Sequence, residues 1–358
     1  MLYRETGQFK TSYAADQQIF PIRQDRVGIA LLLIFAYAVV PFIADQYWFS
    51  AILIPFLIFS LATLGLNILT GYAGQLSLGS AAFMAVGAFG AYNFILRMDM
   101  PAIPAFLLGG LCAALVGVLF GLPSLRIKGF YLAVATLAAQ FFVVWALTKF
   151  GWFSNYSSSG VITAQTIELF GMYPIDTPVE KYMLTLFVVS ILALAAKNMV
   201  RSNTGRSWMA VRDMDVAAEV IGIPLMKTKL LAFAVSSFYC GVAGALVAYC
   251  YLGTVEPEYF TLDLSFRILF MVIVGGVGSI LGSFFGAAFI TLLPIVLNIV
   301  LHPLFGLFGI DISTAVVSNM ELMIFGGLII FFLAVEPHGL ARLWQIGKEK
   351  LRIWPFPH

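Results

Sequence analysis

Residues 264–301 read LSFRILFMVIVGGVGSILGSFFGAAFITLLPIVLNIVL, two apolar runs joined by a glycine-rich segment. Each run is about as long as a helix that crosses a hydrocarbon core of roughly 30 Å. Similar runs recur along a chain that is 61% hydrophobic and only 11% charged, whereas a soluble domain has about 25% charged residues. Too little polar surface is present for a water-soluble globule, so we expect an all-α, polytopic bundle of transmembrane helices.

About ten spans are predicted, within a range of eight to eleven. The range reflects the glycine-rich segments 71–79 and 275–283, each of which is either a simple turn or a re-entrant break in a span. The predicted spans are 27–44, 47–70, 80–96, 102–122, 130–148, 182–199, 229–251, 264–281, 283–301 and 320–335.

The distribution of basic residues predicts the orientation, because Lys and Arg concentrate on the cytoplasmic side of a membrane protein. With the N-terminus inside, the predicted outer loops are acidic or neutral. An odd number of spans would spoil this pattern, so an even number with both termini in the cytoplasm is favoured. Most of the basic residues then lie in four inside segments, 1–26, 123–129, 197–229 and 336–358.

Three regions follow from this map. Residues 1–26 form a cytoplasmic tail that lacks the early apolar core of a signal peptide, residues 27–335 a transmembrane domain, and residues 336–358 a second cytoplasmic tail. The transmembrane domain contains a cytoplasmic loop, 200–228, and a long outer loop, 149–181. The aromatic residues of the outer loop either anchor in lipid headgroups or dock a periplasmic partner.

Several kinds of chemistry are not expected. No G-x-x-x-x-G-K-[ST] loop occurs, so any ATP that drives this protein must be hydrolysed by another subunit. The three cysteines lie in apolar runs and the three histidines are far apart, which predicts no metal site and no cofactor. A net charge of only +2 gives no reason to expect nucleic acid. We therefore do not expect an enzyme.

Ionisable residues are predicted to avoid the middle of the spans. Asp263 falls at a predicted span end, and Arg267 lies about one turn into its span, where we interpret it as snorkelling to the outer interface. Ion-coupled transporters place ionisable groups at depth. Their absence argues against proton-coupled transport.

Residues 71–92 read GYAGQLSLGSAAFMAVGAFGAY and set polar side chains in an apolar context. The glycines can leave helical geometry at low cost. Two interpretations remain open, a plain cytoplasmic turn or a broken element that lines a translocation path. Polar residues of such a path can equally satisfy neighbouring backbone groups, and the candidates are Asn67, Gln75, Ser77, Ser80 and Gln140.

Residues 275–286 read GGVGSILGSFFG. No βαβ unit surrounds this string, so a dinucleotide site is not expected. Gly278, Gly282 and Gly286 are four residues apart, which places them on one face of a helix and predicts close helix packing. Ala113, Gly117 and Gly121 repeat the spacing.

Residues 201–224 read RSNTGRSWMAVRDMDVAAEVIGIP, the most amphipathic cytoplasmic stretch. Ser202, Asn203 or Thr204 is a suitable cap for one helix that ends near Gly222 and Pro224. Such a helix lies on the membrane or docks in a groove of a partner. Its mixed charge favours docking, through an apolar stripe of Trp208, Val211, Val216, Val220 and Ile221.

Six segments together resemble the permease subunits of branched-chain amino acid ABC importers, of the LivM type. The resemblance covers nearly all of the chain after residue 60, and it implies a second permease subunit, two cytoplasmic ATPases, a periplasmic solute-binding protein and a bacterial inner membrane. The segments are NILTGYAGQLSLGSAAF (67–83), LRIKGFYLAVATLA (125–138), GRSWMAVRDMDVAAEVIGI (205–223), KLLAFAVSSFYCGVAGAL (229–246), FMVIVGGVGSILGSFFGAAF (270–289) and EPHGLARLW (336–344).

The resemblance also implies an ATPase-coupling motif, Ala-Ala-x3-Gly, which matches Ala217, Ala218 and Gly222. The glutamate that often precedes the alanines is replaced by Val216, with Asp215 one position earlier. The other residues assigned to this coupling loop are Gly205, Arg206, Trp208, Arg212 and Asp213.

The chain departs from the family at two places. Ser80 stands where His or Gln is common, and SSSG at 157–160 stands where Thr-Gly-Gly or Thr-Asn-Gly is common. Both positions bear on solute passage. The solute class therefore stays open between branched-chain amino acids and urea, short amides or aromatic acids, and the competing class of protein is a stand-alone secondary transporter or channel.

Overall fold

The computed structural model describes residues 11–12, 18–20, 23–122, 130–157, 161–165, 167–169, 173–306, 314–335 and 339–353. Some predictions lie outside the described residues. They concern most of the tail at 1–26, the basic segment 123–129, positions 158–160 of SSSG, residues 336–338 and the end of the C-terminal tail at 354–358.

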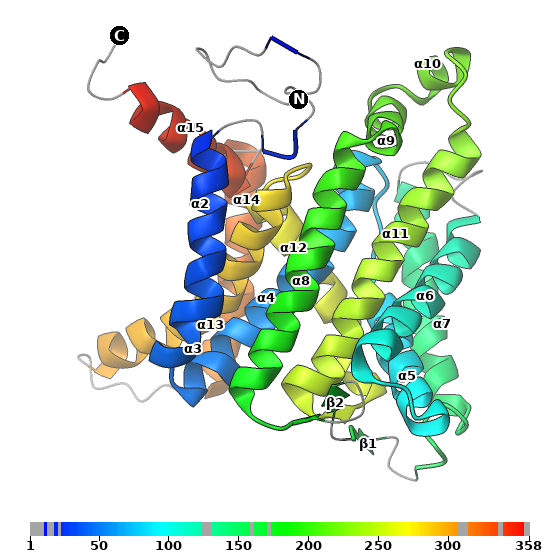
Figure 1. Ribbon diagram of the computed structural model, residues 1–358, viewed down its shortest axis with the longest axis vertical. Helices are drawn as coiled ribbons and strands as arrows, with labels where there is room; N and C mark the ends of the chain where they lie inside the picture. The colour runs from blue at the N-terminus through cyan, green and yellow to red at the C-terminus, as the bar shows by residue number, and fades with distance from the viewer. Residues whose placement is uncertain are drawn as a thin grey trace.

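Long helices arranged side by side form the described structure (Figure 1). π-Helical segments extend three of them, so that α4 continues from Trp48 to Tyr72 and α11 continues to Leu252. The helices are α2 (Arg23–Ile34), α3 (Val40–Ile43), α4 (Ile54–Asn67), α5 (Ser80–Met98), α6 (Ala102–Gly121), α7 (Phe130–Lys149), α8 (Pro178–Arg201), α9 (Asn203–Asp213), α10 (Asp215–Val220), α11 (Leu225–Leu246), α12 (Leu262–Gly275), α13 (Ile280–Gly306), α14 (Thr314–Val335) and α15 (Gly339–Ile353), with π-segments η1 (Phe35–Val39), η2 (Trp48–Leu53), η3 (Ile68–Tyr72) and η5 (Val247–Leu252) and the 3-10 turn η6 (Pro257–Tyr259).

Eight helical runs within the described residues are long and apolar enough to cross a membrane. The prediction of a full span at 264–281 is wrong. α12 ends at Gly275 and has 14 residues, which at 1.5 Å per residue reach about 21 Å, less than a hydrocarbon core. The predicted span 320–335 lies within α14, and the total of about ten spans stays a prediction.

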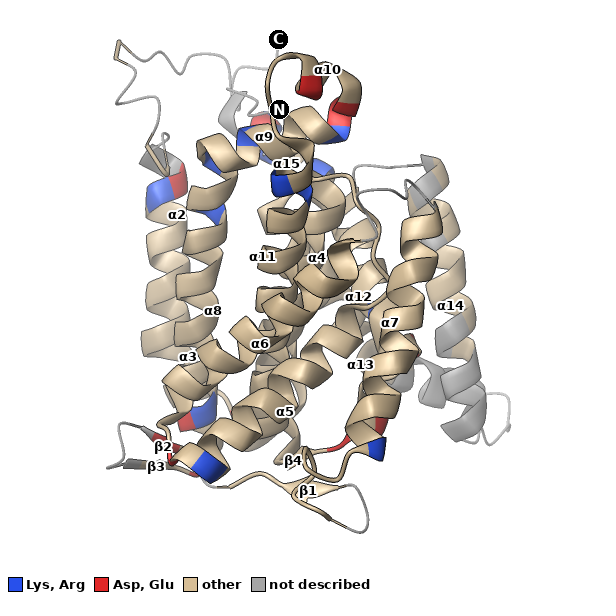
Figure 2. Ribbon diagram, turned by 90° about the vertical axis from the view of Figure 1, so that its right-hand side faces the viewer, with Lys and Arg blue, Asp and Glu red and all other residues tan. Residues whose placement is uncertain are grey.

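Charged residues lie mainly at the two ends of the bundle, separated by a nearly uncharged band (Figure 2). This is the distribution expected of helices that cross a membrane. α2, α9, α10 and α15 share one end (Figure 1), where Lys348 Nζ of α15 lies 3.1 Å from Asp25 Oδ1 of α2. The first and last described helices therefore meet at the end that the basic residues assign to the cytoplasm.

Short strands lie at the opposite end. β1 (Ile162–Thr163) pairs antiparallel with β4 (Thr254–Val255), and β2 (Ile167–Leu169) pairs with β3 (Tyr173–Ile175). The predicted outer loop thus contains two small sheets, one of which ties the loop to the segment that follows α11.

Small residues allow the central helices to pack closely. Gly87 of α5 and Gly241 of α11 leave no room for a side chain between them, and Gly117 of α6 lies against Ser237 of α11. Gly282 and Gly286 of α13 face the backbone of α12. Gly278 differs from the prediction of a shared helical face: it has φ +79° in the turn between α12 and α13.

Candidate functional site

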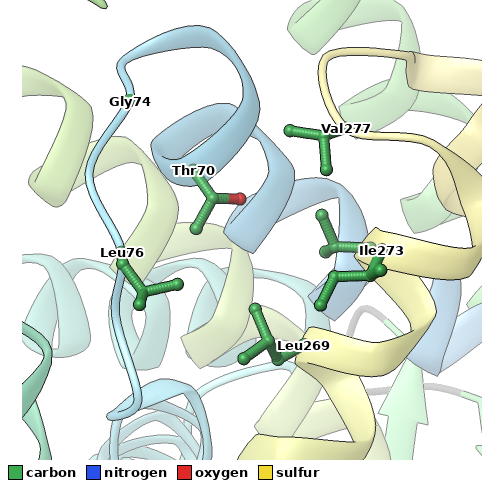
Figure 3. Close-up of a pocket in the computed structure, with 7 residues that line it drawn as sticks. Thr70, Gly74, Leu76, Leu269, Ile273 and Val277 are labelled. Atoms are coloured by element: carbon green, nitrogen blue, oxygen red, sulfur yellow. The ribbon is translucent and has the colours of Figure 1, made fainter. Parts of the chain in front are cut away.

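The chain turns back into the bundle after α4. Helical structure ends at Tyr72, and α5 begins only at Ser80. The connecting residues are not a plain turn, because Gln75 and Ser77 are 5% and 1% exposed. Gly74 has φ +68°, and Arg212 Cγ lies 2.7 Å from the place where a Cβ would sit, so only glycine fits. Figure 3 shows this segment running beside the helix that carries Thr70.

Side chains of α7 fix the depth at which α5 begins. Thr136 Oγ1 accepts a hydrogen bond from Leu78 N at 2.9 Å, and Gln140 Oε1 accepts one from Ala82 N at 2.7 Å. Gln140 lies midway along α7. The first turn of α5 is therefore inside the bundle, and the structure favours a broken element over a cytoplasmic turn at 71–79.

A second broken element approaches from the other end. After α11, the strand β4 and the turn η6 (Pro257–Tyr259) lead to α12, which begins at Leu262. Gln140 Nε2 donates to Phe260 O at 2.7 Å. Ser265 Oγ accepts from Ala81 N at 2.9 Å and donates to Gln140 Oε1 at 3.2 Å. Gln140 thus connects the start of α5 with the start of α12.

Four of the five candidate path residues lie in the segment that leads into α5 or bond to its first turn. Gln75, Ser77 and Ser80 precede or begin α5, and Gln140 reaches its first turn. Gln75 Oε1 and Ser80 Oγ are buried with no hydrogen-bond partner among the described residues, which is uncommon for buried polar atoms. These atoms give the start of α5 an unused capacity for hydrogen bonding.

Asn67 lies elsewhere. Its Nδ2 donates to Ser279 O at 2.8 Å and to Ser283 Oγ at 2.9 Å, and its Oδ1 accepts from Gly278 N at 2.8 Å. These bonds satisfy the turn between α12 and α13. Asn67 therefore holds α4 against that turn, near the cytoplasmic end.

Arg212 links α9 to the cytoplasmic end of the helical run that contains α4. Its Nη1 donates to Gly71 O at 2.8 Å, and its Nη2 lies 2.8 Å from Asp213 Oδ1. The backbone of Gly278 occupies the position that a side chain of Gly71 would need. The cytoplasmic loop therefore contacts both glycine-rich segments at one point, which we call the Gly71 joint (Gly71, Gly74, Arg212 and Gly278).

The prediction of one helix across 203–222 is wrong. The chain leaves helical geometry at Met214, with φ −153° and ψ 99°, and the apolar stripe is divided between α9 and α10. Trp208 is fully buried, and its Nε1 donates to Thr228 O at 3.1 Å, which fastens α9 to α11. Val211 is buried with it.

The short helix α10 instead presents apolar side chains to solvent. Met214, Val216, Val220 and Ile221 are 66–82% exposed and define what we call the α10 patch. Of the predicted coupling motif, Ala217 is exposed, Ala218 is buried, and Gly222 ends the region with φ +88°. Gly205, Arg206 and Asp213 lie on α9, where Gly205 contacts the last turn of α8.

Arg267 lies at a depth that the sequence did not indicate. Its Cζ is 5.8 Å from the centre of the Phe59 ring, and Phe59 lies near the middle of the helical run Trp48–Tyr72. The interpretation of Arg267 as snorkelling to the outer interface is wrong, because α12 begins inside the bundle. The proline in GTVEPEYFT (253–261) was the available sign that no helix continues there.

A largely apolar groove of about 370 Å³ lies between α12 and residues 73–79, which we call the returning segment. Leu76 and Leu269 point into it from opposite sides (Figure 3). The lining residues are Thr70, Gly74, Leu76, Leu269, Val272, Ile273 and Val277.

Comparison with known proteins identifies the family. Residues 48–333 match the family described as branched-chain amino acid transport system permease component. The chain belongs to this family. It is the transmembrane permease of an ABC importer, a multi-pass protein of the inner membrane whose partners include an ATPase and a binding protein. Permease subunits of this family are not the catalytic subunits.

Curated relatives agree with this assignment. The permease is 29% identical over 309 residues to the high-affinity branched-chain amino acid permease protein LivM of Escherichia coli, covering 79% of this chain and 68% of that protein. It is 23% identical over 328 residues to a probable LivM of Methanocaldococcus jannaschii, covering 81% and 92%. The autoinducer 2 import permease LsrC of Enterobacter sp. is 27% identical over 230 residues, covering 62% and 63%. No solved structure matches significantly.

Within the described residues, no group of three or more His, Cys, Asp or Glu side chains lies close enough together to hold a metal ion.

We expect Gln140→Leu to destabilise the permease. The change leaves Ala82 N–H and Phe260 C=O unpaired inside the bundle, at about 1–3 kcal/mol each. The unfolding midpoint in detergent, followed by tryptophan fluorescence, should fall by about 5–10 °C. Gln345→Leu is the matched control, because the bond of its side chain within the described residues goes to Glu349 on the same helix, α15. Equal midpoints for the two variants would contradict the linking role of Gln140.

Proposed function

We propose that the permease imports branched-chain amino acids handed over by a periplasmic binding protein. The observation that carries the proposal is the pair of broken helices whose starts meet at Gln140, because irregular backbone at membrane depth belongs where it lines a path. The relatives named LivM support the solute class. LsrC is named for autoinducer 2, a different solute, so the similarity to LivM supports the amino acids without deciding between solute classes.

The α10 patch is the proposed docking point for the ATPase. It lies at the cytoplasmic end, it is apolar, and it is held away from the bundle by the break at Met214. An exposed apolar cluster rimmed by charged residues such as Asp213 and Glu219 is typical of a protein interface. The buried Trp208 keeps α9 rigid, so a force applied to α10 reaches the bundle.

In this proposal, the Gly71 joint transmits the motion of the ATPases to the broken helices and so produces alternating access. A shift of α9 carries Arg212, which pulls on Gly71 O and bears on Gly74. Gly74 leads directly into the returning segment and the start of α5. Closure of the ATPases would thereby move both broken helices, whose contacts at Gln140 must rearrange for solute to pass.

A second permease subunit completes the proposed importer, with two ATPases below the pair. The apolar groove beside α12 is open on the surface of this chain. We place the second permease on that side, so that the path lies between the two subunits. We propose a different chain as the second permease, and a second copy of this chain is the alternative.

The solute is tested by uptake into liposomes that contain the whole importer. We expect ATP-dependent uptake of labelled leucine, with strong competition from isoleucine and valine and weak competition from urea and benzoate. Competition by urea or benzoate in place of the amino acids would assign the alternative solute class. Transport of any of them by this chain alone, without ATP, would support a stand-alone transporter and contradict the proposal.

We expect Val220→Asp to release the ATPase. A charge in the α10 patch should weaken co-purification of the ATPase at least tenfold, as for a central interface residue. Leu343→Asp is the control, because Leu343 is also exposed near the cytoplasmic end but lies on α15. An unchanged yield of ATPase with Val220→Asp would place the docking surface elsewhere.

Arg212→Met tests the joint. The variant keeps the aliphatic stem beside Gly74 but loses the bond to Gly71 O. In the intact complex, a non-hydrolysable ATP analogue should change hydrogen exchange at residues 71–79, and the variant should lose that change while it retains the ATPase. Lys350→Met removes the same charge from an exposed position on α15 and should respond like the parent. A normal nucleotide response in Arg212→Met would exclude transmission through this residue.

A further inference from the structure

Two charged residues lie in the first turns of α12, next to the backbone that Gln140 and the first turn of α5 hold inside the bundle. Arg267 lies beside Phe59, near the middle of the run Trp48–Tyr72. Asp263 precedes it by four residues and is exposed. Neither has an ion-pair partner among the described residues, and Arg267 Nε is buried with no hydrogen bond.

Lipid is not a suitable environment for this pair. A charged side chain at the centre of a bilayer is costly, and such residues face the protein interior or a water-filled cavity. The exposed side of α12 must therefore be covered by protein or line an aqueous path. The same helix forms one wall of the open apolar groove, through Leu269 and Ile273.

We propose that Arg267 and Asp263 form a solute site in the translocation path, specific for a zwitterion with adjacent carboxylate and ammonium groups. The inference rests on the proposed import function and adds the residues that recognise the solute. The Arg267 guanidinium binds the carboxylate, for which its planar fork is suited. The Asp263 carboxylate accepts the hydrogen bonds of the ammonium group.

The spacing on α12 fits such a solute. Residues four apart on a helix lie on the same side, with Cβ atoms about 5–6 Å apart, so an α-amino acid can reach both. The apolar groove continues along α12 toward the cytoplasmic end, where Leu76, Leu269 and Ile273 line it. An aliphatic side chain of the solute has an apolar surface there.

The site also fits the place of the broken helices. Phe260 and Ser265, which flank Asp263, are the residues held by Gln140 and the first turn of α5. A movement of α5 driven from the Gly71 joint therefore displaces the start of α12. The affinity of Arg267 and Asp263 for solute would change with the same motion, as alternating access requires.

The test measures binding of labelled leucine to the detergent-purified complex of both permeases and the ATPases, without the binding protein. Arg267→Gln should lower leucine affinity about tenfold, because a charge-assisted contact is lost. Arg267→Lys should retain part of the affinity. Arg97→Gln is the matched control, since Arg97 contacts Trp152 near the outer end and should leave leucine binding unchanged.

Two analogues separate direct contact from a structural effect. Leucinamide lacks the carboxylate, and 4-methylpentanoate lacks the ammonium group. Arg267→Gln should bind leucine no better than the parent binds leucinamide, and it should leave leucinamide binding unaffected. Asp263→Asn should show the complementary pattern with 4-methylpentanoate. A structural defect would instead weaken all three ligands together.

Three results would overturn the site. They are an absence of leucine binding by the parent complex, unchanged leucine binding in Arg267→Gln, and loss of the second permease from that variant, which would assign Arg267 to the subunit interface. ATP-driven leucine uptake by the parent importer, measured in parallel, distinguishes the two proposals. If uptake is present and Arg267→Gln matches it, only the site is wrong. If no ATPase co-purifies with the parent, the proposed import function is wrong, and the site that rests on it is wrong with it.

Discussion

Backbone amides and carbonyls inside a membrane must find hydrogen-bond partners within the protein, and this constraint governs the segments that lead into α5 and α12. The first turn of α5 and the residues before α12 are both satisfied by Gln140, with help from Thr136 and Ser265. One side chain of an unbroken helix thus makes two interrupted helices possible. The primary role of Gln140, Thr136 and Ser265 is therefore to satisfy backbone groups that would otherwise lack hydrogen-bond partners.

A second meeting point lies nearer the cytoplasm. Asn67 bonds the turn between α12 and α13, Gly71 lies against Gly278, and Arg212 of α9 bonds the Gly71 carbonyl. The close approach is possible only because these backbone positions carry no side chain. The two meeting points are connected by the returning segment 73–79 and by α12. Movement of the cytoplasmic loop therefore has a continuous packed route to the middle of the membrane, in line with alternating access.

The depth of individual residues is where prediction from the sequence was weakest. Residues 264–281 are apolar along nearly their whole length and match a span, so Asp263 and Arg267 were placed at its outer edge. The structure starts α12 inside the bundle, and the same two residues become deep. In the cytoplasmic loop, the period of the apolar residues predicted one amphipathic helix, and the break at Met214 divided it. In both cases the apolar pattern was correct and the local geometry was not.

The sequence by itself determined the class of the protein. Apolar runs required a membrane, basic residues predicted the orientation, and glycine with serine and glutamine left a plain turn and a broken element as the two interpretations of segment 71–79. Such properties are local, because each depends on the composition of a short segment and its solvent. Tertiary structure alone decided that Gln140 reaches both broken helices, that Arg212 meets Gly71, and that Arg267 lies beside Phe59. Contacts between residues that are 58 or more positions apart depend on how whole helices pack, which no local pattern specifies.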